Sequence, residues 1–260
     1  CDDHDAPGQR FSDEFICEKY DDQNAIDQFI NAVDIITFEF ENIPYETLKK
    51  INNVKPVVPH PSINKIVQNR LTEKDFLNKL NIRTTQYTSV NNLKDIFSNE
   101  NLIPGLLKTC TLGYDGKGQY KINSIKELTN ANINFNNKYI LEKLVKLKKE
   151  ISVIITRFKD EKCEIYEPIE NTHEDQILKH SKIPADINEN ILEQSKKWTK
   201  MIAEELKYIG TLCVESFIDK NDNLYVNEIA PRVHNSGHLT INAYNRSEEH
   251  TSELQSRETI

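Results

Sequence analysis

Methionine, tryptophan and glycine are scarce in this chain of 260 residues, which contains one, one and seven of them respectively. No apolar run reaches the ~18 residues that a membrane-spanning helix needs, and no apolar leader opens the chain, so we expect no membrane partner. Basic residues are outnumbered, at 33 against 41 acidic ones, and the formal net charge is −8. A nucleic-acid partner would require basic stripes, so this balance argues against one.

What remains is the composition of a globular protein, 37% hydrophobic and 28% charged, and long enough to bury a core in more than one lobe. The chain has five cysteines, an odd number, and their spacing matches no metal-ligand pattern. We therefore expect free thiols in the core and a cytoplasmic location, because the cytoplasm keeps thiols reduced.

Neither end of the sequence has the features of a natural terminus. The first residue is Cys1 and the only methionine is Met201, so we expect the chain to begin inside a longer reading frame. Residues 246–260, RSEEHTSELQSRETI, have no helical or strand period, and most of them read as the translation of a common sequencing adapter. We expect this segment to be an artefact and leave it out of the functional reasoning; a natural disordered tail is the alternative.

Strand and helix patterns alternate from the start. The apolar, β-rich segments 34–40 and 55–59 flank a short helical pattern at 43–52. Such a βαβ order predicts a parallel sheet in an α/β protein. Apolar residues at helical spacing predict further helices over 62–82, 124–133 and 189–206. Further strands are expected within 101–110, 138–170, 211–218 and 223–230.

Residues 113–118, GYDGKG, place three glycines around a lysine, not far from Lys108. Glycine lets backbone N–H groups turn toward an anion, and lysine adds a charge suited to phosphate. The spacing matches neither a Walker A loop nor GxGxxG. The pattern indicates either a phosphate-binding loop or a tight hairpin turn between two strands.

Two acidic residues, Glu215 and Glu228, interrupt the last two apolar strands. A hairpin that turns at Asn221-Asp222 would pair Lys220 with Asn223, and counting outward would place Glu215 opposite Glu228 on one face. Opposed like charges destabilise a strand pair, and a divalent cation would remove that penalty. Oxygen ligands with room for phosphate and water suit Mg²⁺. The alternative is that the carboxylates are solvated on an open sheet face.

Glu142 and Glu150 stand in and beside strand-like segments and could accept hydrogen bonds from a ribose or an adenine. They could equally be surface charges, and periodicity does not decide between the two. The lysines of 143–149 are expected on a solvated face.

The stretch 227–238, NEIAPRVHNSGH, gathers polar groups directly after an apolar strand. Arg232 and His234 could face an anion whose charge shifts during a reaction. Asn235 and His238 could instead hold the loop by hydrogen bonds. Together with the glycine loop and the carboxylate pair, this cluster predicts nucleotide-dependent phosphoryl transfer onto an anionic acceptor.

Six stretches of the chain resemble the N5-carboxyaminoimidazole ribonucleotide synthetases of purine biosynthesis, which are ATP-grasp enzymes. In order they are TFEFENIP (37–44), NRLTEK (69–74), GYDGKGQ (113–119), EPIENTHEDQILKHSKIPA (167–185), CVESF (213–217) and NEIAPRVHNSGHLTI (227–241). They span nearly all of residues 1–245, and the last is the most specific.

The resemblance implies an ATP-grasp fold, of mixed α/β and α+β type, preceded by a partial Rossmann-like domain. It places the partial domain at 1–61 and the ATP-grasp domain at 62–245, with 86–150 as a smaller lid-like part. It also implies that family segments preceding Cys1 and following residue 245 are missing. The fragment is therefore expected to bind the ribonucleotide poorly.

The implied reaction uses ATP and Mg²⁺. ATP phosphorylates bicarbonate, the carboxyphosphate yields CO₂, and the amine of aminoimidazole ribonucleotide captures it. The resemblance further implies a homodimer for the full-length parent. A non-catalytic nucleotide-binding fragment and another ATP-grasp carboxylate ligase are the alternatives.

The resemblance carries over a set of nucleotide contacts and metal ligands. Arg70 and Lys108 resemble phosphate contacts, 113–119 a mobile loop, 142–145 the adenine-binding strand and Glu150 a ribose contact. The full nucleotide and metal set is Arg70, Lys108, Gly113, Tyr114, Asp115, Gly116, Lys117, Gly118, Gln119, Glu142, Lys143, Leu144, Val145, Glu150, His173, Asn227, Glu228 and, as the second metal ligand, Glu215.

A second set is carried over to the substrates. Tyr114 and Asp115 resemble contacts to aminoimidazole ribonucleotide, with help from Glu39 or Glu41. Arg232 and His234 match the bicarbonate and carboxyphosphate region. The residues expected to be catalytic are Arg232, His234 and Lys117.

Overall fold

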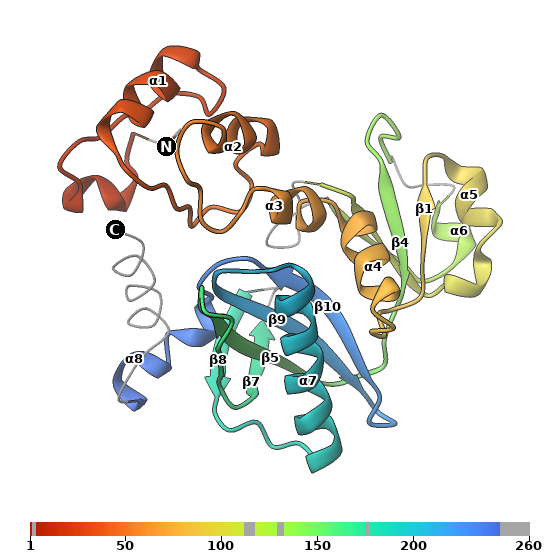
Figure 1. Cartoon of the computed structure of the whole chain (residues 1–260). Helices are drawn as coiled ribbons and strands as arrows, with labels where there is room; N and C mark the ends of the chain where they lie inside the picture. Colours follow the sequence, from red (N-terminus) through yellow and green to blue (C-terminus); the bar gives the residue numbers. More distant parts are fainter. Residues whose placement is uncertain (2–3, 112–117, 129–132, 175–176, 245–260) are drawn as a thin grey trace.

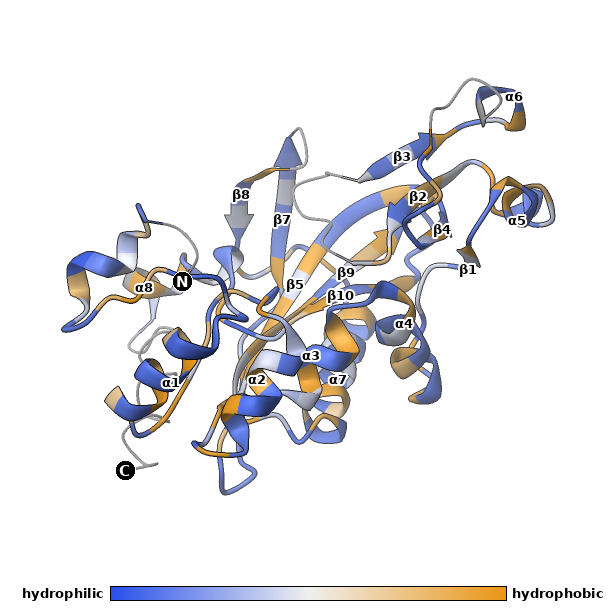
Figure 2. Ribbon diagram, turned by 90° about the horizontal axis from the view of Figure 1, so that it is seen from above, coloured by the Kyte–Doolittle hydropathy of each residue, from blue (hydrophilic) through white to orange (hydrophobic). Residues whose placement is uncertain are grey.

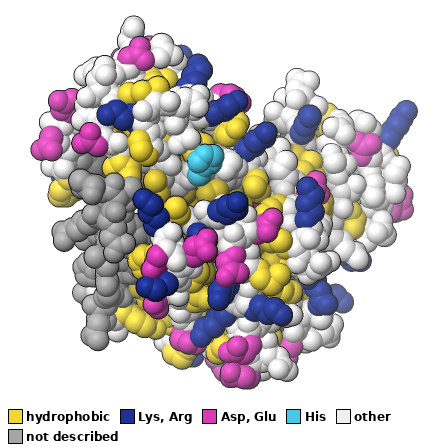
Figure 3. All heavy atoms as spheres, in the orientation of Figure 1, with side chains coloured by type: hydrophobic (Ala, Val, Ile, Leu, Met, Phe, Trp, Pro, Cys, Tyr) yellow, Lys and Arg dark blue, Asp and Glu magenta, His cyan; other side chains and the backbone are white. Residues whose placement is uncertain are grey.

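The computed structural model describes residues 1, 4–111, 118–128, 133–174 and 177–244. It consists of a group of N-terminal helices, a four-stranded sheet and a six-stranded sheet (Figure 1). The short helices α3 and α4 connect the N-terminal group to the rest. On the face shown in Figure 3, acidic and basic side chains are intermixed over the large sheet and its helix.

The N-terminal group contains η1 Pro7–Phe11, α1 Gln23–Ala32 and α2 Tyr45–Asn52. The carboxylate of Asp22 starts α1 by accepting a hydrogen bond from the Ala25 N–H at 2.8 Å, which satisfies one of the free donors of the first turn. Ile26 and Ile30 of α1 pack with Leu48 of α2 in one apolar cluster. The helix predicted over 43–52 is confirmed.

The parallel sheet predicted from 34–40 and 55–59 is wrong for the described residues. The two segments share a single parallel bridge at Ile36, whose N–H donates to the Pro56 carbonyl at 2.9 Å. Pro56 and Pro59 have no N–H, so neither can extend the ladder. All strand pairs within the two named sheets are antiparallel.

The helix predicted over 62–82 is divided into α3 Ser62–Val67 and α4 Arg70–Lys79. Asn69 between them has an extended backbone, with φ −128°, and its side chain accepts a hydrogen bond from the Leu71 N–H at 3.0 Å. A cap of this kind begins a new helix. The apolar period continues through the break, which is why periodicity alone predicted one helix.

The smaller sheet has the strand order β1-β4-β2-β3. Its elements are β1 Tyr87–Val90, α5 Leu93–Phe97, η2 Glu100–Leu102, β2 Gly105–Thr109, β3 Gln119–Ile122, α6 Ile125–Leu128 and β4 Tyr139–Lys143. Val90, Ile96, Leu107 and Leu141 are completely buried in its core. The first part of the helix predicted over 124–133 is confirmed as α6. Residues 129–132 lie outside the described ones.

The larger sheet has the order β10-β9-β5-β7-β8, with β6 paired to β5. Its strands are β5 Leu147–Arg157, β6 Cys163–Ile165, β7 Ile169–Glu174, β8 Ile177–Lys182, β9 Gly210–Asp219 and β10 Leu224–Ala230. Helix α7 Glu189–Glu205 covers one face, where Ile202 and Ala203 pack on Leu212 and Val214 (Figures 1 and 2). The short elements η3 Asn235–Gly237 and α8 Thr240–Ala243 follow β10.

The turn between β9 and β10 differs from the predicted one. The prediction paired Asn223 with Lys220, but in the structure Asn223 pairs with Asp219. The reason is that the Asp219 carboxylate accepts hydrogen bonds from the N–H groups of Asn221 at 2.8 Å and Asn223 at 2.9 Å. An aspartate that bonds to the backbone two residues on is a common turn device. The strands therefore leave the turn one residue out of the predicted register.

A bulge at Asn227 corrects this register. Val226 pairs with Ser216, but the next pair is Glu228 with Glu215, so Asn227 is an extra residue on β10. Without the bulge Glu228 would turn to the core face, because side chains alternate along a strand. The predicted pairing of Glu215 with Glu228 is thus confirmed, although by a different path.

None of the helices in the described part of the chain is long and apolar enough to cross a membrane. All five cysteines are free, as predicted. The expectation that all of them lie in the core is wrong: Cys110 and Cys213 are buried, whereas Cys1 is exposed.

Candidate functional site

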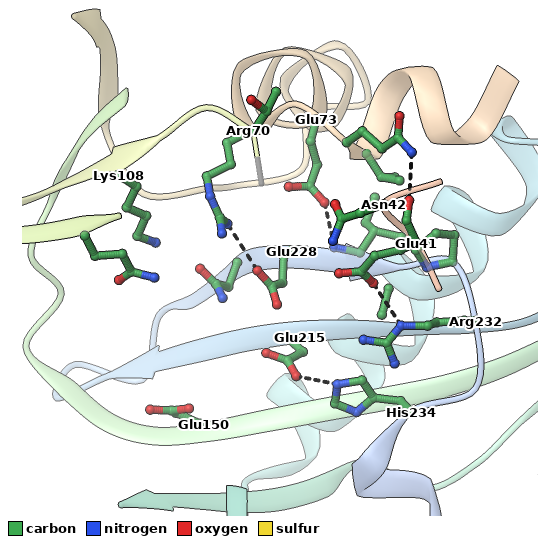
Figure 4. Close-up of a pocket in the computed structure, with 18 of the residues that line it drawn as sticks. Glu41, Asn42, Arg70, Glu73, Lys108, Glu150, Glu215, Glu228, Arg232 and His234 are labelled. Atoms are coloured by element: carbon green, nitrogen blue, oxygen red, sulfur yellow. Dashed lines mark hydrogen bonds and ion pairs between the residues drawn. The ribbon is translucent and has the colours of Figure 1, made fainter. Parts of the chain in front are cut away.

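A cavity of about 720 Å³ lies between the two sheets, with α3, α4 and residues 41–42 at its margin (Figure 4). The large sheet contributes one glutamate from each of β5, β9 and β10, and the small sheet contributes lysines from β2 and β3. Residues that are far apart in the sequence therefore line one polar space.

Glu215 and Glu228 face each other across the hairpin and both line this cavity (Figure 4). The Glu228 side chain keeps 39% of its surface accessible because it faces the cavity. Burial among the surrounding residues nevertheless raises the pKa of the Glu228 carboxyl, and the Glu215 charge raises it further. Two opposed acidic groups in one polar space fit a divalent cation.

Arg70 reaches the same pair from the first turn of α4. Its Nη1 lies 3.3 Å from a Glu228 oxygen. Asn69, by capping α4, fixes where this first turn begins. A guanidinium next to the carboxylates fits the predicted contact to an ATP phosphate, which also carries negative charge.

Glu142 is only 3% exposed, so it is no surface charge. Its carboxylate lies 3.5 Å from the Lys74 amine and 3.4 Å from the Lys108 amine, and it accepts a hydrogen bond from Thr85 at 2.9 Å. Burial opposes ionisation, but the two lysines outweigh it and hold the pKa of the Glu142 carboxyl at about 2. Glu142 is therefore a buried anion that fixes Lys108 at the cavity wall.

The predicted adenine-binding segment, residues 142–145, does not line this cavity, whereas neighbouring Leu106 and Lys108 do. The Glu142 carboxylate is occupied by its protein partners. A contact between adenine and the backbone of this segment stays a prediction.

Glu150 and His173 line the cavity on neighbouring strands β5 and β7. Their carboxylate oxygen and Nδ1 lie 2.7 Å apart. Burial raises the pKa of the Glu150 carboxyl. These two residues are 23 positions apart in the sequence, and both were predicted to belong to the nucleotide site. The structure brings them together.

Arg232 donates from Nε to the Glu41 carboxylate at 2.9 Å and from Nη1 to the Val233 carbonyl at 2.9 Å. Glu41 lines the site cavity, whereas Glu39 lines a separate cavity among the N-terminal helices. Of the two candidates for a substrate contact, the structure brings only Glu41 to the site.

His234 donates from Nε2 toward Glu215 at 2.9 Å (Figure 4). The loop that carries it is held by Ser236, which is completely buried, and by Thr240, whose hydroxyl donates to the Gly237 carbonyl at 2.7 Å. Asn235 and His238 are exposed. Among the described residues no side-chain hydrogen bond of theirs supports the suggestion that they hold the loop, which stays a prediction.

Glu73 and Lys74 were not found by sequence reasoning. Glu73 accepts a hydrogen bond from the Ile229 N–H at 2.7 Å, and burial raises the pKa of its carboxyl to about 8. Lys74 is 1% exposed. Together with Arg70 they are spaced i, i+3, i+4, which places all three on one helix face. That spacing was the available signal, but charged faces usually point to solvent.

Five predicted site residues, Gly113, Tyr114, Asp115, Gly116 and Lys117, lie outside the described residues. The remaining two of that loop are described. Gln119 lines the cavity. Gly118 has φ +71°, and a Cβ there would lie 2.8 Å from the Thr109 hydroxyl, so this position requires glycine.

Among the described residues no group of three or more His, Cys, Asp or Glu side chains is arranged as a metal site. A cation held by Glu215 and Glu228 would need further ligands, which water and substrate phosphates could supply. Mg²⁺ binds in this way, with one or two carboxylates plus water and substrate phosphates.

Two family models match this chain. The model of the ribonucleotide synthetase preATP-grasp domain matches residues 1–68, and that of the ATP-grasp domain matches residues 75–248. The chain belongs to the ATP-grasp family. The predicted fold class is confirmed apart from its parallel sheet.

Within the ATP-grasp family, this chain is similar to N5-carboxyaminoimidazole ribonucleotide synthases. It is 37% identical over 247 residues to that of Staphylococcus aureus strain MRSA252, covering 94% of this chain and 66% of the relative. It is also 37% identical over 240 residues to that of Brucella melitensis, covering 90% and 66%. The resemblance predicted from the motifs is confirmed. The chain spans just under two thirds of the length of these curated relatives.

Solved structures of the same group superpose on this ATP-grasp chain. N5-carboxyaminoimidazole synthetase from Staphylococcus aureus, complexed with ADP, has a TM-score of 0.92 at 36% identity and covers 98% of this chain and 68% of its own. The synthetase from Thermus thermophilus has a TM-score of 0.85 at 29% identity and covers 93% and 66%.

Proposed function

We propose that this protein binds ATP with Mg²⁺ and carboxylates 5-aminoimidazole ribonucleotide with bicarbonate, yielding N5-carboxyaminoimidazole ribonucleotide for purine biosynthesis. The observation that carries the proposal is the opposed pair Glu215 and Glu228 in a cavity that also holds Arg70, Lys108 and Arg232. Carboxylates for a metal ion and cations for phosphate in one space are what phosphoryl transfer requires. The synthase relatives support the choice of substrates.

Each group has a role in this proposal. Arg70 and Lys108 bind the ATP phosphates, and Glu215 and Glu228 would hold Mg²⁺, which neutralises charge on the transferred phosphoryl group when bound. Fixed cations stabilise developing negative charge without reorganising, and Arg232 is held in this way by Glu41. We place bicarbonate and carboxyphosphate next to Arg232 and His234.

The remaining assignments are also proposals. Tyr114 and Asp115 contact the aminoimidazole, Lys117 takes part in catalysis, and the protein works in the cytoplasm as a homodimer. The domain boundaries at residues 61 and 245 remain predictions as well.

The test is ADP release from ATP and Mg²⁺, measured with and without aminoimidazole ribonucleotide and bicarbonate, with the Staphylococcus aureus relative as positive control. We expect release to rise when both substrates are present. Nucleotide binding without ADP release, while the control turns over, would favour a non-catalytic nucleotide-binding protein. Release stimulated only by a different carboxylate would favour another ATP-grasp ligase.

A further inference from the structure

The turn that carries Glu41 is held by two amides of the connecting helix α3. The Gln68 Nε2, at the end of α3, donates to the Glu41 carbonyl at 2.7 Å and to the Ile43 carbonyl at 2.6 Å. The Asn64 Nδ2 donates to the same Glu41 carbonyl at 3.3 Å. Asn64 and Gln68 are four residues apart, which places both amides on one side of the helix. One nitrogen of Gln68 therefore bridges two carbonyls of the turn.

This turn, residues 40–43, has little support of its own. The Ile43 N–H donates to the Phe40 carbonyl at 3.5 Å, which is longer than the usual range of about 2.7–3.2 Å for such a bond. The next residue is Pro44, which has no N–H to donate. Both bonds from Gln68 are shorter than the bond that closes the turn. We infer that α3 fixes the position of the turn.

The side chain at the corner of the turn reaches the candidate anion site. Glu41 and Arg232 both line the site cavity, and the Glu41 carboxylate accepts a hydrogen bond from the Arg232 Nε at 2.9 Å (Figure 4). The Arg232 Nη1 donates to the Val233 carbonyl at 2.9 Å. Among the described residues no hydrogen bond engages the third nitrogen, Nη2. Because a guanidinium is planar, holding two of its nitrogens sets the direction of the third.

We propose that Gln68, together with Asn64, is a positioning residue for Arg232. By bridging the carbonyls of the turn, Gln68 places the Glu41 carboxylate where it holds the Arg232 Nε, and Nη2 is then left for the bicarbonate. The inference rests on the proposed function where it takes Arg232 as the contact to bicarbonate. Neither amide belongs to a stretch that the sequence assigned to the site. The N-terminal group thus completes a site whose other charges come mainly from the two sheets.

The first test observes the Arg232 guanidinium directly in the ligand-free protein. Arginine Nε–H signals are recorded by ¹⁵N NMR at low temperature, where they exchange slowly, and the Arg232 signal is assigned by its loss in Arg232→Lys. Glu41→Gln should move this signal, because the charged acceptor is gone. Gln68→Met keeps the length of the side chain but removes both donated bonds. We expect hydrogen exchange at the Arg232 Nε to become about fivefold faster, the change in population that one typical hydrogen bond produces.

Asn52→Leu is the matched control for Gln68→Met. It removes another half-buried amide from the N-terminal group, whose oxygen accepts from the Val57 N–H at 3.1 Å and whose bonds lie outside the turn. We expect no change in the Arg232 signal. Unchanged exchange in Gln68→Met, or an equal change in the control, would overturn the proposal.

A second variant covers the case in which Gln68→Met does not fold, as judged by thermal unfolding. Gln68→Glu keeps the shape and the polarity of the side chain, but an ionised carboxylate has no hydrogen to donate to a carbonyl. It should accelerate exchange at the Arg232 Nε in the same direction. Exchange as slow as in the unmodified chain would contradict the proposal.

The second test separates positioning of Arg232 from a general loss of the site. In Gln68→Met, the bicarbonate concentration that gives half-maximal ADP release should rise by about fivefold, for the same reason. The Kd of ADP with Mg²⁺ should stay unchanged, because we assign the nucleotide phosphates to Arg70 and Lys108. Equal weakening of both quantities would show that the variant disturbs the whole cavity, and it would contradict the positioning role.

The two tests distinguish this inference from the proposed function. If exchange at the Arg232 Nε responds but bicarbonate never stimulates ADP release, the proposed function fails and the positioning of Arg232 stands. If ADP release is stimulated while neither the exchange nor the bicarbonate dependence responds, the positioning role fails alone.

Discussion

At the scale of single residues, the structure gives definite partners to charges that the sequence left open. Glu142 could have been a ribose contact or a surface charge, and it is a buried anion between Lys74 and Lys108. Glu228 could have been solvated, and it faces Glu215 in a cavity. In both cases the deciding partner lies far away in the sequence.

Replacing Glu142 should cost much stability. Glu142→Gln leaves two lysines buried without their counter-charge, and breaking a buried pair in this way typically costs about 3–5 kcal/mol. The measurement is urea unfolding at pH 7. Glu164→Gln, at an exposed position on β6, is the control and should change little. A Glu142→Gln protein as stable as the control would show that the ion pairs contribute nothing.

The same carboxylate predicts a pH dependence. Its folded pKa of about 2 lies below the ordinary value of 4.5, so its contribution to stability is complete above pH 4.5. It is lost between pH 4.5 and 2, by about 1.4 kcal/mol for each pH unit. Unfolding free energy measured across this range should therefore fall less steeply in Glu142→Gln than in the unmodified chain; equal slopes would contradict the assignment.

Replacing Glu228 should act on the metal ion. Glu228→Gln keeps the shape of the side chain but removes one of two charged ligands, so we expect Mg²⁺ to bind at least about tenfold more weakly in titrations with ADP. Glu174→Gln, exposed at the end of β7, is the control. Unchanged Mg²⁺ affinity in Glu228→Gln would refute the metal assignment.

At the scale of elements, short polar residues decide where helices and turns begin. Asn69 divides one apolar period into two helices, and Asp219 widens the last turn by bonding the backbone. The bulge at Asn227 then restores the facing of Glu228. Element type was predicted well because it follows local periodicity, whereas the breaks depend on side-chain bonds that periodicity does not contain.

Helix α7 offers a direct measurement of such a cap. The Asn188 side chain accepts a hydrogen bond from the Ile191 N–H at 3.0 Å, so Asn188→Ala should lower the unfolding free energy by about 1 kcal/mol. Asn190→Ala makes the same replacement two residues later, at an exposed helical position, and should be neutral or slightly stabilising. Equal losses in both variants would show that the cap is not the cause.

At the scale of the whole molecule, α4 joins the two sheets around the cavity. Arg70 and Glu73 bind β10 of the large sheet, while Lys74 binds Glu142 of the small one. A ligand between the sheets would contact both, so its binding energy adds to the stability of the entire ATP-grasp arrangement.

We expect ADP with Mg²⁺ to stabilise the protein. A ligand at 100 times its Kd adds about 2.7 kcal/mol, which corresponds to a rise in melting temperature of roughly 5–10 °C for a chain of this size. Thermal unfolding with ADP and Mg²⁺, compared with ADP and EDTA, measures it. If EDTA leaves the shift intact, nucleotide binding does not use the metal ion.

The sequence by itself determined the chemistry of the site and most of the elements, because motifs and periodicity are local properties of the chain. It identified the carboxylate pair, the arginine and histidine after β10, and the ATP-grasp family. Only the tertiary structure decided that α4 turns its charges inward, that Glu142 is buried between lysines, and that the Gln68 amide holds the turn that carries Glu41. These features depend on contacts between segments up to 158 residues apart, and no local pattern specifies which distant partner a polar side chain will meet.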